Sequence, residues 1–170
     1  STGATTATIN NLTAGTYTVT ASDANGCTTS TTATITQPSL LAVAIPSTTN
    51  VLCNGTSTGS ATALASNGTA GYTYQWNTGA TTATINNLAA GTYTVTATDA
   101  NGCTTSTTAT ITQPTLVTVS IPSITNVLCN GGATGSATAL ASNGTAGYTY
   151  QWNTGATTAT IRSEEHTSEL

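Results

Sequence analysis

The chain has 170 residues, a formal net charge of −4 at pH 7, and only 4% charged residues. This composition excludes a nucleic-acid-binding role, because phosphate contacts need Lys or Arg and residues 1–161 contain neither. No apolar run is long enough for a transmembrane helix, so membrane insertion is not expected.

An internal repeat organises the chain, because the segment that starts at Thr2 returns at Thr78, which gives a period of 76. Over the 85 pairs that align residues 1–85 with residues 77–161, ten pairs differ and 75 are identical. This period is too long for one solenoid coil and suits one small all-β domain per repeat. Pro38 and Pro114 end the units, because proline cannot continue a strand ladder. Residues 1–38 are therefore the C-terminal part of one unit, 39–114 a complete unit, and 115–161 the N-terminal part of another.

The complete unit shows apolar residues at every second position and no helical period, which predicts β-strands. Six alternating segments occur in chain order, with these inward residues: Leu41, Val43 and Ile45; Ala61, Ala63 and Ala65; Tyr72, Tyr74 and Trp76; Ala83 and Ile85; Tyr93, Val95 and Ala97; Ala109 and Ile111. Turn signals such as Asn67-Gly68 and Thr78-Gly79 separate them. Six short strands in this length predict a small antiparallel β-sandwich.

Two aromatic residues are assigned structural roles. Trp76 ends an aromatic strand and suits the buried Trp of immunoglobulin-like sandwiches. Tyr93 in "LAAGTY" suits a tyrosine corner, whose hydroxyl bonds back to upstream backbone. We interpret these rings as core residues; the alternative, a sugar-stacking platform, requires exposed rings.

The motifs CNG, YTYQWNTG, LAAGTY, DANGC and QP together resemble the SprB repeat of bacterial surface adhesins, over essentially all of residues 1–161. Parts of the unit are also similar to the related PKD-type sandwich. The resemblance implies a secreted cell-surface protein, exported by the type IX pathway of gliding bacteria and used in adhesion or gliding. One departure is Thr58, where family members often carry an acid, and this argues against a cation site in the "CNGTSTG" loop.

The four cysteines, Cys27, Cys53, Cys103 and Cys129, lack the spacing of a zinc site, and residues 1–161 contain no His that could activate a thiol. In an exported protein a structural disulfide is expected. Pairs across the unit boundary, Cys27–Cys53 and Cys103–Cys129, are one possibility. Counting four strands of alternating direction between Cys53 and Cys103 places this pair at one end of the unit, so we predict a Cys53–Cys103 disulfide, with Cys27 and Cys129 pairing outside the fragment.

No catalytic, cofactor-binding or metal-binding residues are predicted, and no cofactor. Each unit offers one Asp, whereas acid–base chemistry needs a titratable pair. Asp99 and Gly102 in "DANGC" are assigned to a turn, with Asp opening it and Gly at a positive-φ position. A calcium ligand is the alternative role for Asp99, but one carboxylate is few for an ion that takes six to eight oxygens.

These observations predict a non-enzymatic stalk or spacer in a surface adhesin, whose partners are neighbouring repeat units of the same chain. The alternative is a set of multivalent carbohydrate- or surface-binding modules, with surface glycans as partners.

Residues 162–170, "RSEEHTSEL", contain the only Arg, the only His and three of the five acids. The repeat register predicts Asn-Asn-Leu after Ile161, yet Arg162 follows instead. These nine residues also match, codon by codon, a translated sequencing-library adapter. We therefore interpret them as non-native and expect His166 and the neighbouring acids to form no site.

Overall fold

A computed structural model describes residues 4–162, and the segment interpreted as adapter-derived lies outside them except for Arg162. The described residues form eleven β-strands and no helix, and none of their elements is a helix that could span a membrane. The strands are β1 (Gly15–Ser22), β2 (Thr28–Ile35), β3 (Ala42–Thr49), β4 (Gly59–Ser66), β5 (Thr73–Trp76), β6 (Thr84–Leu88), β7 (Gly91–Thr98), β8 (Thr104–Ile111), β9 (Thr118–Thr125), β10 (Ser136–Ser142) and β11 (Thr160–Arg162).

Residues 39–114 contain two three-stranded sheets, β3-β4-β6 and β5-β7-β8, in which every strand pair is antiparallel. The six strands are the six that the alternating segments predict, and the all-β class is confirmed. Because alternate side chains point to opposite faces of a strand, each sheet buries one face against the other. In β4 the small inward residues Ala61, Ala63 and Ala65 are buried, whereas outward Leu64 is 58% exposed.

The main core lies between these two sheets and takes residues from both. Its buried members are Val51, Ala61, Ala63, Trp76, Ile85, Leu88, Val95, Ala109 and Ile111. Trp76, Val95 and Ile111 are the largest side chains that are almost fully buried. Since Val95 and Ile111 come from β7 and β8, the core closes only when this hairpin covers the other sheet.

The two ends of the complete unit differ in which chain terminus they hold. At the N-terminal pole the carbonyl of Ser39 accepts a hydrogen bond from the N–H of Gly68. At the C-terminal pole the side-chain amide of Asn54 donates to the carbonyl of Pro114, and the N–H of Val51 donates to Thr112. The chain therefore enters the unit at one end and leaves at the other.

The connection between β5 and β6 changes sheet without reversing direction. β5 pairs with β7 from Thr73↔Thr98 to Trp76↔Val95, so it starts at the N-terminal pole and stops halfway. β6 then runs to Leu88, opposite Gly59, at the C-terminal pole. The two short strands thus make one pass along the unit, and this corrects the expectation of strictly alternating directions.

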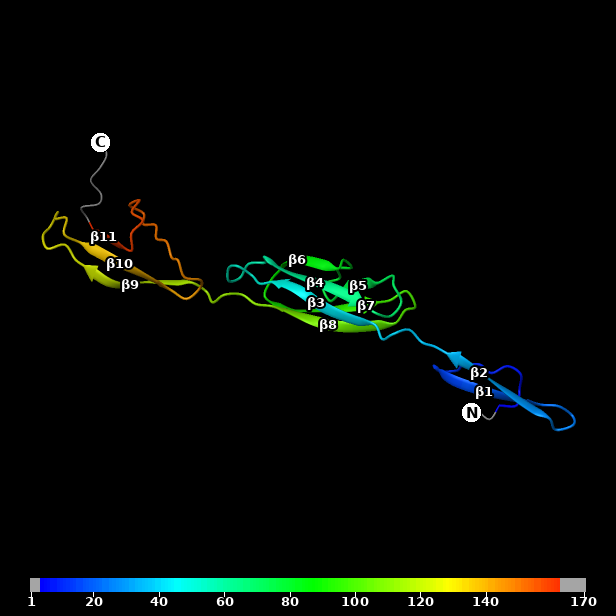
Figure 1. Cartoon of the computed structure of the whole chain (residues 1–170). Helices are drawn as coiled ribbons and strands as arrows, with labels where there is room; N and C mark the ends of the chain where they lie inside the picture. The colour runs from blue at the N-terminus through cyan, green and yellow to red at the C-terminus, as the bar shows by residue number, and fades with distance from the viewer. Residues whose placement is uncertain (1–3, 163–170) are drawn as a thin grey trace.

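The partial units are built from the corresponding strands, shifted by one repeat period (Figure 1). The hairpin β1-β2 matches β7-β8, and the sheet β11-β10-β9 matches β6-β4-β3. Residues 149–152, which match β5, are not a strand. Figure 1 shows the three β bodies one after another in chain order, joined by connecting segments that contain Pro38 and Pro114. Each partial unit therefore holds one portion of the sandwich seen complete in residues 39–114.

Candidate functional site

Asp99 organises the turn between β7 and β8 and ties it to a loop far away in sequence. Its Oδ1 accepts the N–H groups of Asn101 (3.0 Å) and Cys103 (2.9 Å), and its Oδ2 accepts the N–H of Thr69 (3.0 Å). The side chain is 5% exposed. The hydrogen bond from Thr69 does most to lower the pKa of this carboxyl group below its ordinary value; burial opposes it, and the N–H groups of Cys103 and Asn101 add to the lowering.

Gly102 lies in the same turn at φ +83°, and its N–H donates to the carbonyl of Asp99 at 3.0 Å. A left-handed backbone at this position favours glycine. Asp23 makes the equivalent turn bonds to the N–H groups of Asn25 and Cys27. Every hydrogen bond that the carboxylates of Asp23 and Asp99 accept comes from a backbone N–H group. Both residues therefore stabilise a turn. Within residues 4–162 no group of three or more His, Cys, Asp or Glu side chains could hold a metal ion.

The aromatic residues of the complete unit point inward or bond to backbone. Trp76 is 1% exposed and donates its indole N–H to the carbonyl of Thr82 at 2.9 Å. The Tyr74 hydroxyl accepts the N–H of Ala65, and the Tyr93 hydroxyl donates to the carbonyl of Ala89 at 3.0 Å. The last contact has the geometry of a tyrosine corner, repeated by Tyr17 in the first segment. A sugar-stacking platform needs exposed ring faces, and Trp76 offers none.

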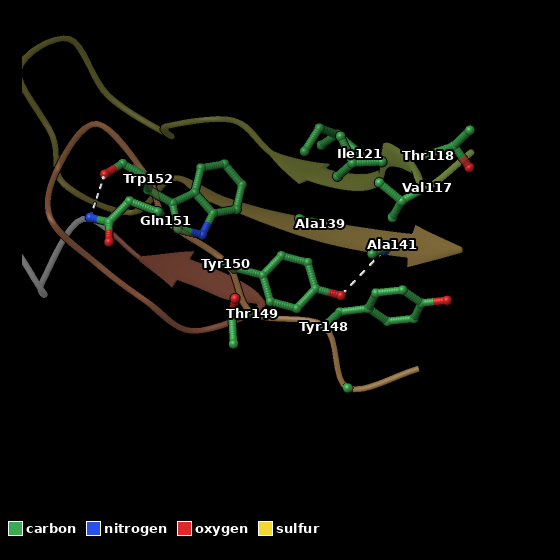
Figure 2. Close-up of a pocket in the computed structure, with 12 residues that line it drawn as sticks. Val117, Thr118, Ile121, Ala139, Ala141, Tyr148, Thr149, Tyr150, Gln151 and Trp152 are labelled. Atoms are coloured by element: carbon green, nitrogen blue, oxygen red, sulfur yellow. Dashed lines mark hydrogen bonds between the residues drawn. The ribbon is translucent and has the colours of Figure 1, made fainter. Parts of the chain in front are cut away.

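The corresponding aromatic segment of residues 115–162 is uncovered and lines a groove of about 530 Å³. Figure 2 shows Tyr148, Tyr150 and Trp152 along one side, facing Ala139 and Ala141 on β10. The Tyr150 hydroxyl accepts the N–H of Ala141 at 3.2 Å, as Tyr74 does with Ala65. The groove therefore has the shape of one half of a sandwich core.

Sequence reasoning did not single out this groove, although the repeat register contained the signal. Residues 115–161 match 39–85 and stop short of the positions that match β7 and β8. The inward residues of this segment consequently have no second sheet over them within the described residues.

The predicted Cys53–Cys103 disulfide is wrong for this structure, in which all four cysteines are exposed free thiols. Cys53 follows Val51 at the C-terminal pole, whereas Cys103 precedes β8 at the N-terminal pole. The eight residues of β8 separate the poles by about 26 Å, while a disulfide joins Cα atoms no more than about 7 Å apart. The strand count failed because β5 and β6 share one pass. Pairing of Cys27 and Cys129 outside the fragment stays a prediction.

The model of the SprB repeat family matches residues 45–81 and 121–157. The two matches start at residues 45 and 121, so they lie one period of the internal repeat apart. Each begins in the strand β3 or β9 and ends five residues after the Trp of the aromatic segment, Trp76 or Trp152. No curated protein and no solved structure matches the chain significantly.

Proposed function

We propose that this chain, which carries two SprB repeats, belongs to the non-enzymatic extracellular repeat region of a bacterial surface adhesin and serves as a stalk or spacer. SprB repeats are typical of gliding-motility surface adhesins, and this resemblance supports a location on the cell surface and export by the type IX pathway.

The observation that carries the stalk role is the placement of the two chain ends at opposite poles of the unit. Ser39 lies at the N-terminal pole beside Gly68, and Pro114 lies at the C-terminal pole beside Asn54. Domains with this arrangement extend a chain with each unit instead of folding it back on itself. β8 alone spans about 26 Å between the poles, so each added unit contributes at least that length.

The surface of the complete unit supports a mechanical role over a catalytic one. Asp99 is its only carboxylate, and that group is engaged by three backbone N–H groups. The outward faces of β7 and β8 carry Thr at every position except Ser106, and such hydroxyl groups leave few groups that could activate a substrate.

Small-angle X-ray scattering on chains with two, three and four complete units tests the stalk. We expect the maximum dimension to rise linearly, by at least about 26 Å per added unit. A radius of gyration that grows only as that of one compact domain, roughly with the 0.38 power of length, would overturn the proposal.

Carbohydrate binding is the second candidate, favoured by the hydroxyl-rich outward faces of β7 and β8, which recur with each repeat unit. A glycan array probed with the 170-residue chain at high density tests it, because weak sites become detectable through multivalency. Binding to particular glycans would favour this candidate, and a blank array would favour the spacer.

A further inference from the structure

Strand β6, at the edge of its sheet in the complete unit, contains one residue that has no partner on β4 (Figure 1). The pairing runs from Ser60↔Asn86 directly to Gly59↔Leu88, so Asn87 is the extra residue. Its φ is +56°, in the left-handed region that Asn adopts more readily than most residues. This irregularity is a β-bulge, and bulges re-aim the side chains of an edge strand.

The bulge turns two consecutive amide side chains to the same side of the strand. In a regular strand neighbouring side chains point to opposite faces. In β6, however, Asn86 and Asn87 are both exposed, between the buried Ile85 and Leu88. Both amides line a groove of about 630 Å³ on the complete unit. The bulge thus keeps both apolar neighbours in the core while it gives both amides to the groove.

A further part of the groove wall is Ser57, in the loop that begins with the CNG motif. This loop is held on both sides of Ser57. The Thr56 hydroxyl donates to the carbonyl of Cys53 at 2.9 Å, and the N–H of Leu52 donates to the Thr58 hydroxyl at 3.0 Å. The position of Ser57 is therefore fixed before any ligand arrives, which lowers the entropic cost of binding.

The polar groups of the groove divide into those that are engaged and those that are free. The Thr82 hydroxyl donates to the carbonyl of Thr84 at 2.7 Å, and the Thr84 hydroxyl bonds to another threonine of β4 at 3.0 Å. Among residues 4–162 the side chains of Ser57, Asn86 and Asn87 have no hydrogen-bond partner. One hydroxyl and two amides are therefore available to a ligand.

The chemistry of these groups points to an uncharged ligand rich in hydroxyls. None of the described residues that line the groove is charged, so a charged ligand would find no counter-charge there. Each amide offers two donors and an acceptor, and the hydroxyl offers both functions. The half-buried ring of Tyr93 adds apolar surface to the lining. Sugars present hydroxyl groups and C–H faces together, and so match both parts.

We infer that this groove binds a neutral saccharide through Asn86, Asn87 and Ser57. The inference rests on carbohydrate binding, the second of the two proposed functions, but it moves the site from the outward faces of β7 and β8 to the bulged edge of the other sheet.

The key features of the groove recur with the repeat. Asn11, one period before Asn87, has φ +57° and follows Asn10, and Tyr17 takes the place of Tyr93. Recurrence at every period would make weak single sites effective together, because linked sites bind a multivalent surface with higher avidity.

A glycan array that carries neutral and acidic oligosaccharides, probed at high density with the 170-residue chain, tests the site. Asn10→Ala and Asn11→Gly are made in every chain tested, so that only the groove of the complete unit keeps both amides. We expect binding to neutral glycans, and at least about tenfold weaker binding once Asn86→Ala and Asn87→Gly are added. Glycine accepts the left-handed backbone of position 87, so this variant removes the amide without strain.

Two milder variants and one spectrum separate a binding role from a structural one. Ser57→Ala should weaken binding about threefold, and it is structurally mild because the next unit carries Ala133 at this position. Thr94→Ala with Thr108→Ala is the matched control, since this pair lies on the outward face of β7 and β8, and it should bind like its parent. In the parent chain the side-chain amide NMR signals of Asn86 and Asn87 should shift when a bound glycan is added.

The outcomes distinguish failure of the site from failure of the proposed function. Binding that survives the loss of both amides, or that disappears in the Thr94→Ala and Thr108→Ala chain, would overturn this site while leaving carbohydrate binding in place. Binding to acidic glycans alone would also overturn it. A blank array would overturn both the site and the carbohydrate candidate, and would leave the stalk role standing.

Discussion

Residues 39–85 and 115–161 are 40 of 47 identical, yet they differ in what they bury. Val51 is 4% exposed and its identical counterpart Val127 is 52% exposed. Leu64 and Leu140, which point outward, are 58% and 54% exposed and so hardly differ. The difference is confined to inward positions, and it shows that this sequence makes a core only when strands β7 and β8 are added from elsewhere in the chain.

Local interactions, by contrast, are the same in both segments. The indole N–H of Trp76 donates to Thr82 and that of Trp152 to Thr158, at 2.9 and 2.8 Å. The N–H of Trp76 bonds to Ala80 as that of Trp152 bonds to Ala156. Turns and short loops thus form from neighbouring residues, whereas burial needs contacts between distant residues.

Replacing the Trp should have the largest effect. Trp76→Ala removes a side chain that is 1% exposed, and loss of such a core residue costs about 3–5 kcal/mol. Trp152→Ala removes the same hydrogen bond from a groove open to solvent and should cost no more than about 1 kcal/mol. Hydrogen exchange of the β7 and β10 amides in the respective variants measures each loss. Equal losses in the two variants would contradict the comparison.

Substituting the turn glycines should have a smaller effect with the same asymmetry. A Cβ at Gly68 would lie 2.8 Å from Oδ2 of Asp99 and 3.2 Å from Cβ of Leu41, at φ +59°. At Gly144 it would meet Cβ of Val117 at 3.2 Å, at φ +63°, with no carboxylate near it. Both backbones disfavour Ala, so Gly68→Ala should cost about 1–3 kcal/mol and Gly144→Ala less. Urea unfolding followed by circular dichroism measures both, and a larger loss in Gly144→Ala would contradict the role of Asp99.

Acidification should weaken the complete unit through Asp99. A carboxyl group whose pKa is lowered on folding stabilises the native state above its unfolded pKa of about 3.9, and this stabilisation disappears as the pH falls through the lowered native pKa. The urea midpoint of residues 39–114 should therefore fall below about pH 4. Trp76 fluorescence reports it in a Trp152→Phe background, since the chain has two Trp. Asp99→Asn should lower the midpoint at pH 7 and flatten this pH dependence; an unchanged slope would assign the acid sensitivity elsewhere.

The strands could be predicted because they follow a local alternation of apolar residues, and the repeat because two segments of the sequence are nearly identical. Alternation of Ala61, Ala63 and Ala65 fixes a strand and its inward face, and the repeat period follows from a direct comparison of letters. The roles of Trp76 and Tyr93 follow from motifs whose partners, Thr82 and Ala89, are six and four residues away.

What the sequence did not reveal depends on which way each strand runs. Residues 77–83 look like an ordinary hairpin turn, yet they carry the chain from one sheet to the other without reversing it. One such connection moves Cys103 to the pole opposite Cys53. Likewise, the hydrogen bond from the N–H of Thr69 to Asp99 joins loops 30 residues apart, and no local sequence pattern predicts it. The packing of the whole unit decides which sheet each strand joins. A wrong assignment therefore leads to wrong predictions for residue pairs that are far apart in sequence, such as Cys53 and Cys103.

The tyrosine corner occurs twice, at Tyr93 and at Tyr17. Its removal should lower stability least, because each corner is a single local hydrogen bond. Tyr93→Phe removes a hydroxyl that donates to Ala89 at 3.0 Å, and Tyr17→Phe removes one that donates to Thr13 at 2.9 Å. Each bond is worth about 1 kcal/mol. In residues 39–114 the ring also packs against the core, so the loss should appear as a lower urea midpoint of the whole unit. In the first segment the hairpin has no second sheet over it within the described residues, and the loss should be confined to faster exchange of the β1 and β2 amides. A cooperative loss in both segments would show that the hairpin is as well packed as the complete unit, contrary to its exposed Val19.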